Sequence, residues 1–299
     1  AAVLVFACFF VSMWVTNDVA LLTFVPFSLM ALPKVASEEQ MALVIVLQTL
    51  AANLGSMCTP VGNPQNLYLY FYYAMDLPSF LTLLLPYTLV SFLLLTLSLF
   101  RLPGTPIPIS VRLAARRTRN LPVLAPSRRL WLLGGMFFLS LLTVAHVLDY
   151  RLTLAIVIVV TSLTRPRYFR YADYRLLGTF VAFFILVGNM SQLPGFRDLL
   201  TGYLEGHEFL IALLASQVIS NVPAAVLLSG FTDEAAALLL GTDIGGLGTL
   251  IASMASLISY GMYVRACPRQ QGRYLKLFSL LNLAYLLVLV LFAWLLVRC

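Results

Sequence analysis

Charged side chains are scarce in this sequence. Asp, Glu, Lys and Arg make up 10% of the 299 residues, whereas 61% are hydrophobic, and the mean hydropathy is +0.94. A soluble domain carries about 25% charged residues and could not bury this much apolar surface in one core. The composition therefore excludes an ordinary soluble protein and predicts a chain that lies mainly in lipid.

Cysteine is also rare, and its spacing is uninformative. The four cysteines are Cys8, Cys58, Cys267 and Cys299, and none of them forms a C-x-x-C pair. Three lie inside or at the ends of apolar runs, where cysteine commonly acts as a small hydrophobe. We therefore expect no disulfide framework and no metal or other cofactor.

The common catalytic signatures are absent. The sequence contains no HExxH, GxSxG, Walker or paired-His motif, and its paired acids, Glu38-Glu39 and Asp233-Glu234, fall in predicted loops. We therefore expect no enzymatic activity. A membrane-embedded enzyme and a purely structural membrane subunit remain as minor alternatives.

Long apolar runs are what the sequence has in abundance. Residues 79–100, 130–148, 176–193 and 277–297 each approach the roughly 20 residues that a spanning helix needs, and shorter runs lie between them. The predicted fold class is an all-α polytopic membrane protein.

Basic residues are concentrated beside these runs. Of the 19 Lys and Arg residues, 15 lie in three stretches: 101–129, 165–175 and 265–276. Cytoplasmic loops are enriched in Lys and Arg, so we place these stretches inside a bacterial cytoplasmic (inner) membrane. The same rule accounts for the net charge of +7, and no nucleic-acid partner is expected.

This topology has a consequence for two segments. Residues 209–231 lie between acidic stretches that both belong outside, so this segment enters and leaves on the same face, as a re-entrant hairpin does. An earlier hairpin around Asn17 opens inward, at residues 34–39.

Two stretches resemble each other and indicate an internal repeat. The segment NLGSMCTPVGNPQNLYLY from Asn53 aligns without gaps with DIGGLGTLIASMASLISY from Asp243, and each follows a polar break, at Asn17 and Asn221. Transporters often contain inverted repeats with broken helices. We therefore predict a first repeat at 1–100, a basic linker at 101–129 and a second repeat at 130–299. Three apolar segments precede the second hairpin and none precedes the first, so repeat symmetry predicts about 75 further residues upstream.

The breaks are the candidate site, because a helix can be interrupted at mid-membrane only where it lines a polar cavity. Hydroxyl and amide oxygens at the hairpin tips suit Na⁺, and half-helix N-termini favour an anion. Asp18 and Asp243 are the acids placed at membrane depth, as ligands for Na⁺ or as H⁺ carriers, with simple helix capping as the alternative. The candidate substrate- and ion-binding residues are Thr16, Asn17, Asp18, Asn53, Gly55, Thr59, Pro60, Gly62, Asn63, Asn66, Ser220, Asn221, Asp243, Gly245, Gly246 and Thr249. A possible Na⁺ is assigned to Thr16, Asn17, Gly55, Ser220, Asn221 and Gly245.

Four motifs together resemble the ion transporter superfamily, which includes divalent-anion/sodium symporters, citrate permeases and arsenite-permease-like proteins. They are SMWVTNDVALLTFVPF, TPVGNPQN, ISNVPAAVLL and DIGGLGTLIASMAS, in that order. In the symporters both hairpin tips usually read Ser-Asn-Thr and contact sodium and the substrate carboxylate. Here the tips read Thr16-Asn17-Asp18 and Ser220-Asn221-Val222, and Asp18 is more like the Asn-Asp of arsenite permeases. The resemblance implies a scaffold and a transport domain, an elevator-like motion and often a homodimer.

The predicted function is secondary active transport of a small anion, either a di- or tricarboxylate or an inorganic oxyanion, coupled to Na⁺ or H⁺. The predicted partners are this anionic substrate and the lipid bilayer. A Na⁺/H⁺ antiporter and an arsenite-type efflux permease on the same fold are the alternatives.

Overall fold

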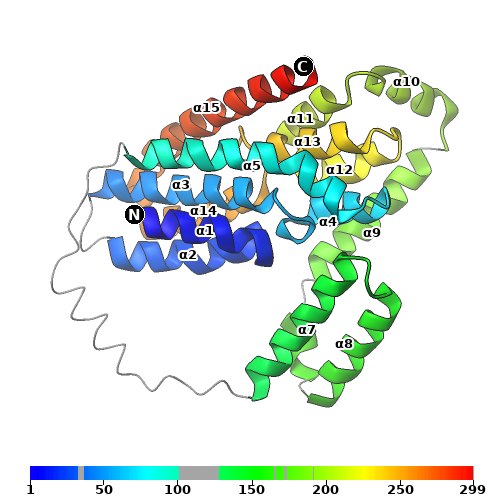
Figure 1. Ribbon diagram of the computed structural model, residues 1–299. Helices are drawn as coiled ribbons and strands as arrows, with labels where there is room; N and C mark the ends of the chain where they lie inside the picture. Colours follow the sequence, from blue (N-terminus) through cyan, green and yellow to red (C-terminus); the bar gives the residue numbers. More distant parts are fainter. Residues whose placement is uncertain (33–36, 101–127, 165, 172–173, 191, 299) are drawn as a thin grey trace. The chain divides into compact units, whose positions relative to one another are not determined.

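The structure is a computed structural model that describes residues 1–299 except 33–36, 101–127, 165, 172–173, 191 and 299. All regular elements of the described residues are helices, as the composition predicted (Figure 1). The α-helices are α1 (Ala2–Val15), α2 (Asn17–Ala31), α3 (Glu38–Ser56), α4 (Pro64–Tyr72), α5 (Leu77–Phe100), α7 (Arg128–Val144), α8 (Tyr150–Thr164), α9 (Tyr174–Met190), α10 (Pro194–Leu204), α11 (Glu208–Ile219), α12 (Asn221–Ser229), α13 (Ala235–Gly245), α14 (Met254–Ala266) and α15 (Gln271–Arg298). Short 3₁₀ turns occupy η2 (Pro60–Gly62), η3 (Pro166–Tyr171) and η4 (Pro268–Gln270).

Two described helices are long and apolar enough to cross a bilayer. They are Leu77–Phe100, with a mean hydropathy of 2.1, and Pro268–Leu296, with 2.4. The runs 130–148 and 176–193 form α7 and α9, which have 17 residues each and are shorter than the full crossings predicted for them. Helix α7 ends at Val144 because the next residues turn, with His146 at φ 56°, although Val147 and Leu148 are still apolar.

The chain forms two compact units. One combines Ala1–Thr105 with Phe180–Cys299, and the other is Pro106–Thr179. In the smaller unit α7 packs against α8, and the hydroxyls of Thr143 and Thr153 lie 2.6 Å apart. Most of the predicted basic linker 101–129 lies outside the described residues. The boundaries of the predicted repeats stay a prediction, because the two halves of the larger unit pack against each other and form one compact unit.

Within the larger unit, one packing pattern occurs twice. Helices α1 and α2 pack against each other and against α3, and helices α11 and α12 pack in the same way against each other and α13. We call α1–α2 the first hairpin and α11–α12 the second; α1–α5 form one half of the unit and α11–α15 the other. The second arm of each hairpin also contacts the opposite half: α2 packs on α14, and α12 packs on α4. Each hairpin is therefore held partly by the broken helix of the opposite half.

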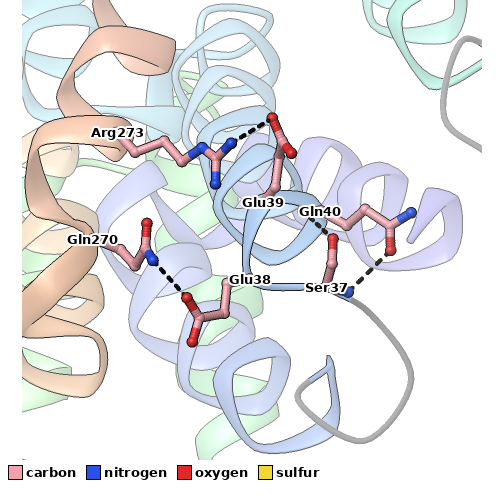
Figure 2. Close-up of polar contacts among 6 residues, drawn as sticks. All are labelled: Ser37, Glu38, Glu39, Gln40, Gln270 and Arg273. Atoms are coloured by element: carbon pink, nitrogen blue, oxygen red, sulfur yellow. Dashed lines mark hydrogen bonds and ion pairs between the residues drawn. The ribbon is translucent and has the colours of Figure 1, made fainter.

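Two contacts join loops at the start of α3 and α15 (Figure 2). Ser37 caps α3, the next residue Glu38 accepts a hydrogen bond of 2.6 Å from Gln270, and Glu39 pairs with Arg273 at 3.2 Å. Both members of the ion pair are more than half exposed, so its contribution to stability is about 0–1 kcal/mol. Its structural meaning is that the N-terminal end of α3 lies next to the basic stretch 265–276.

A second set of contacts joins α4 to the end of the second hairpin. The Tyr73 hydroxyl donates to the Thr232 carbonyl at 2.8 Å, and the Tyr68 hydroxyl lies 2.7 Å from that of Ser229. The acidic residues Asp76 and Asp233 are close to these contacts in the chain. Which membrane face each end meets stays a prediction.

Candidate functional site

Each helical hairpin turns at a single residue in an unusual backbone conformation. Thr16 has φ 80° and ψ 149°, and Ser220 has φ 74° and ψ 152°. This region of the Ramachandran map is occupied almost only by glycine, and a residue with a side chain there costs on the order of 1–3 kcal/mol. This conformation reverses the direction of the chain at a single residue, so that α2 begins directly at Asn17 and α12 at Asn221.

Close packing of the first arm on the broken helix holds each tip in place. A Cβ added to Gly55 would lie 2.2 Å from the Phe9 carbonyl oxygen, and one added to Gly245 would lie 2.8 Å from the Ser216 Cβ. Only glycine permits this approach. It occurs at the same place in both halves. Ser12 and Ser216 lie four residues before their hinges, Phe9 and Leu213 lie seven residues before them, and the two glycines lie at the ends of α3 and α13.

The first broken helix is interrupted between Ser56 and Pro64. Gly62 folds back so tightly that an added Cβ would lie 1.9 Å from the Ser56 carbonyl oxygen. Asn63 caps α4 by accepting from the Asn66 backbone N–H at 2.8 Å. Pro60 is buried in the connecting 3₁₀ turn, and the Thr59 hydroxyl donates to the Met13 carbonyl of the first hairpin.

The second broken helix is held by Gln217, a residue of α11. Its amide nitrogen donates to the carbonyls of Gly245 at 2.7 Å and Leu247 at 2.9 Å, and its amide oxygen accepts from the Thr249 N–H at 2.9 Å. The Thr249 hydroxyl donates to the Gln217 carbonyl at 3.0 Å, which repeats the contact between Thr59 and Met13. The side chain of Gln217 thus already binds the carbonyl of Gly245, one of the residues to which a possible Na⁺ was assigned.

A first polar centre forms around Asn53 at the end of α3. Its Oδ1 accepts from Asn17 Nδ2 at 3.2 Å and from the Ser253 hydroxyl at 3.0 Å, and its Nδ2 donates to the Ser256 hydroxyl at 3.3 Å. All four residues are buried. Both polar atoms of the Asn53 amide are therefore hydrogen-bonded, by groups from α2 and from the start of α14.

A second centre forms around Asp243, the residue that aligns with Asn53. Its Oδ1 accepts from Asn63 Nδ2 at 3.1 Å and from Gln65 Nε2 at 3.2 Å. The neighbouring Asn66 instead donates from Nδ2 to the Met57 carbonyl at 3.3 Å. Asp243 is 5% exposed and Gln65 is 2% exposed. The Asp243 carboxylate of the second half is thus bound by amides of the first half, and Asn53 of the first half is bound by hydroxyls of the second half.

The two centres are connected. Asn63 also donates to the Ser56 hydroxyl at 3.4 Å, and Ser56 belongs to the same helix end as Asn53. On the other side, the Asn221 amide lies against Gly246, since a Cβ added there would be 2.9 Å from Asn221 Nδ2. The N-termini of α2, α4, α12 and α14 and the C-termini of α3 and α13 therefore meet at one buried polar cluster.

Several predicted site residues take a local role beside the cluster. Thr16 accepts a long hydrogen bond from Val19 N–H at 3.5 Å, and the Ser220 hydroxyl donates to the Ala252 carbonyl at 3.3 Å. Asp18 follows the first tip and is partly exposed, with its backbone N–H bonded to Asn17 Oδ1. Thr249 is exposed.

The sequence prediction omitted Gln65, Ser253, Ser256 and Gln217, all of which make contacts between segments far apart in the chain. Gln65 and Ser256 lie within the two aligned stretches, and this position was the signal that could have identified them as site residues. Which amide or hydroxyl faces the opposite half depends on how α4 packs on α13 and how α14 packs on α3, and periodicity does not specify that packing.

The cluster combines a buried carboxylate with several helix N-termini. Among the described residues, the buried charged side chains are Glu208 and Asp243, and no buried Lys or Arg is found there. Positive potential comes instead from the helix N-termini, each equivalent to roughly half a unit charge.

Comparison with known proteins gives a consistent family. Residues 1–258 match the model of the CitMHS family, described as citrate transporter. The chain is 30% identical over 298 residues to the uncharacterized transporter MJ0456 of Methanocaldococcus jannaschii, covering 97% of this chain and 78% of that protein. It is 31% identical over 268 residues to the inner membrane protein YbiR of Escherichia coli, covering 88% of this chain and 69% of that protein. The chain is an integral membrane transporter that belongs to the CitMHS citrate transporter family.

Proposed function

We propose that this protein is a secondary active transporter that moves a small anion, either a di- or tricarboxylate or an inorganic oxyanion, in symport with Na⁺ or H⁺. Its family indicates a transporter of citrate-type anions. Beyond what the family indicates, we propose the class of substrate and the coupling ion named above, a homodimeric state and a location in the inner membrane.

The observation that carries this proposal is the convergence of four helix N-termini on the buried asparagine cluster. Asn17 and Asn221 begin α2 and α12, and Asn63 caps α4. Backbone N–H groups at helix N-termini and amide N–H groups are donors for carboxylate or oxyanion oxygens. A polar group without a partner costs several kcal/mol in hydrocarbon, so the concentration of polar groups at the breaks favours a site that a polar ligand enters.

The repeated contacts support an inverted-repeat arrangement with re-entrant hairpins. The hinge, the glycine contact and the threonine contact recur in the same order in both halves. In the second hairpin, neither arm reaches the roughly 20 residues of a full crossing, because α11 has 12 residues and α12 has 9. We place the tips near mid-membrane and the basic stretches 165–175 and 265–276 in the cytoplasm.

Coupling to a cation follows from the electrostatics. A citrate-type anion entering this cluster would meet no buried Lys or Arg among the described residues, and it would meet the Asp243 carboxylate. Helix dipoles offset only part of that charge. A cation that enters with the substrate supplies the remaining positive charge, and its gradient can then drive transport.

The test is uptake of labelled citrate, succinate, sulfate, phosphate and arsenite into proteoliposomes with imposed Na⁺ or H⁺ gradients. We expect uptake of one or more of these anions that requires a cation gradient and falls at least tenfold in Asn17→Ala and Asn221→Ala. Uptake that is unaffected by both substitutions would refute the assignment of the tips.

A second candidate function is supported by one observation, the buried Asp243 carboxylate. An ionisable group at membrane depth is a common ion-binding element of cation/proton antiporters. In that case the protein exchanges Na⁺ for H⁺ and transports no organic anion. Absence of uptake for every anion, with Na⁺/H⁺ exchange that is lost in Asp243→Asn, would favour this function; arsenite extrusion would favour the arsenite-type permease.

A further inference from the structure

One face of helix α15 carries basic residues at its start and exposed apolar residues along the rest of its length. The 3₁₀ turn η4 leads directly into α15, and the two together are long and apolar enough to cross a bilayer. The residues of this face recur every three or four positions, which is the spacing of one side of an α-helix, and all of them are exposed. They are Arg269, Arg273, Lys276, Leu280, Leu283, Leu287, Leu291 and Trp294. We call this set the α15 stripe.

The opposite face of the same helix packs into the protein. Its buried residues include Tyr274, Phe278, Tyr285 and Leu289. The Tyr274 ring stacks on that of Tyr263 in α14, with 4.7 Å between the ring centroids. This packing fixes the rotation of α15 about its own axis, and the stripe is therefore a permanent part of the outer surface of the unit.

Positive charge is concentrated at the start of the stripe. Arg273 pairs with Glu39 at 3.2 Å, and the neighbouring Glu38 already accepts a hydrogen bond of 2.6 Å (Figure 2). Arg269 and Lys276 make no ion pair with any residue that the structure describes. The start of the stripe thus presents two exposed cationic groups to an anion from outside the protein.

We propose that the α15 stripe binds an anionic phospholipid, with the headgroup phosphate at Arg269 and Lys276 and an acyl chain along the leucines. Guanidinium and ammonium groups donate hydrogen bonds to phosphate oxygens, and basic residues beside a spanning helix attract anionic lipids. At 1.5 Å per residue, Lys276 and Leu287 are ~16 Å apart along the helix, close to the ~15 Å of hydrocarbon in one leaflet. One lipid therefore matches the stripe in both charge and length.

The general preference for basic residues on the cytoplasmic side does not explain this arrangement. That preference accounts for the number of basic residues in the stretch 265–276, and it would be met equally by basic residues on any face of the helix. The phosphate and the acyl chains of a lipid are covalently joined, so both must meet the same side of the helix. The alignment of Arg269 and Lys276 with the exposed leucines fulfils this requirement.

A second copy of the chain fits the stripe less well. In a dimer with its two-fold axis normal to the membrane, both copies have the same orientation, so identical residues lie at the same depth. Arg269 and Lys276 of one copy would face the same residues of the other, and like charges brought together oppose association. An anionic headgroup at this place meets no such repulsion.

The test measures lipid binding to the full-length protein in detergent, by native mass spectrometry with added phosphatidylglycerol or phosphatidylcholine of the same acyl chains. We expect phosphatidylglycerol to bind at least tenfold more tightly than the zwitterionic lipid. Substituting Arg269→Gln and Lys276→Gln together should weaken phosphatidylglycerol binding about 25-fold, since each basic residue near the membrane surface contributes about fivefold. Binding of phosphatidylcholine should not change.

The matched control removes two exposed arginines from another basic stretch, Arg167→Gln and Arg170→Gln in η3. Its affinity for phosphatidylglycerol should stay within about twofold of that of the unmodified protein. Exchanging the two charges, Arg269→Lys with Lys276→Arg, should preserve binding and separates loss of charge from loss of fold. Inorganic phosphate, which has no acyl chain, should not displace the lipid at equal concentration.

Three outcomes would overturn the proposal. They are equal binding of the two lipids, an equal loss of phosphatidylglycerol binding in the control and in the stripe variant, and displacement of the lipid by an equal concentration of inorganic phosphate. A change from dimer to monomer in the stripe variant, with unchanged lipid binding, would also overturn it and assign the stripe to a second copy. Because no transport is measured, failure of anion uptake would count against the proposed function alone.

Discussion

Replacing Gly55 by Ala adds a methyl group at the closest approach of α1 and α3. The new Cβ would lie 2.2 Å from the Phe9 carbonyl oxygen and 2.6 Å from the Ser12 hydroxyl. Ordinary contacts need roughly 3.5 Å, so α1 must move away from α3 by about 1 Å. The nearest atom belongs to the backbone and cannot rotate aside. We expect a loss of about 3 kcal/mol in the free energy of unfolding, at the upper end of the range for overpacking.

The effect should reach the site, because α1 ends at the Thr16 hinge and moves the tip with it. The hydrogen bond from Asn17 to Asn53, already 3.2 Å long, would be lost, and anion uptake should fall with it. We would measure the melting temperature of the purified protein and uptake in proteoliposomes. A loss of this size corresponds to a decrease of about 5 °C for a chain of 299 residues.

Two further glycines serve as graded controls. Gly245→Ala places a Cβ 2.8 Å from the Ser216 Cβ, a smaller overlap, whereas Gly261→Ala meets nothing within 4 Å. Gly261 lies inside α14, where Ala is favoured over Gly by about 1 kcal/mol. The expected order of stability is Gly261→Ala, Gly245→Ala, Gly55→Ala, from highest to lowest. Equal melting temperatures for Gly55→Ala and Gly261→Ala would refute the reasoning.

Three other substitutions test separate parts of the fold. Gln217→Leu leaves the Gly245 and Leu247 carbonyls without their donor, so stability should fall by about 2–4 kcal/mol in thermal unfolding, and an unchanged melting temperature would contradict the role of this amide. Ser220→Gly removes the strain of a φ of 74° and should raise the melting temperature slightly; a lower melting temperature would contradict this reading of the hinge. Arg273→Gln removes an exposed ion pair with Glu39, and we expect the free energy of unfolding in detergent to change by less than about 1 kcal/mol; a larger loss would show that this end of the unit depends on the pair.

The sequence alone predicted the all-helical class, the positions of the hairpin tips and the interruptions of the two broken helices. Polar residues inside apolar runs and clusters of Pro and Gly mark these places, because the backbone must leave the helix there. Hydropathy did not give the end of α7, since the apolar residues Val147 and Leu148 continue into the turn that follows it. The structure shows shorter helices at 130–148 and 176–193 than the apolar runs indicated.

The composition of the site was predictable in its asparagines and less so in its other members. Asn17 was identified by its place at the first hairpin tip, Asn63 by its place in the first break, and Asn53, near the end of α3, by its place at the start of the aligned stretch. Ser253 and Gln65 bond to groups 200 and 178 residues away, and a repeat alignment pairs equivalent residues without indicating which ones meet across the halves. These contacts depend on how the helices of one half pack on those of the other, and the sequence alone does not give that packing.

The difference between Asn53 and Asp243 leads to a last prediction. In Asn53→Asp, the new carboxylate would be satisfied by Asn17 and by the Ser253 and Ser256 hydroxyls, because a hydroxyl that now accepts from Asn53 can turn and donate. The protein should therefore fold with a second buried negative charge in its cluster. At a distance of ~6 Å and an effective dielectric constant of ~20, that charge opposes an anion by about 3 kcal/mol, or roughly 100-fold in affinity. We expect the KM for the transported anion to rise accordingly and its uptake to need a higher Na⁺ concentration, while Asn53→Gln, which adds no charge, should leave the Na⁺ requirement unchanged. If KM stays the same in Asn53→Asp, the anion does not approach the first centre, and the neutrality of Asn53 has no part in substrate binding.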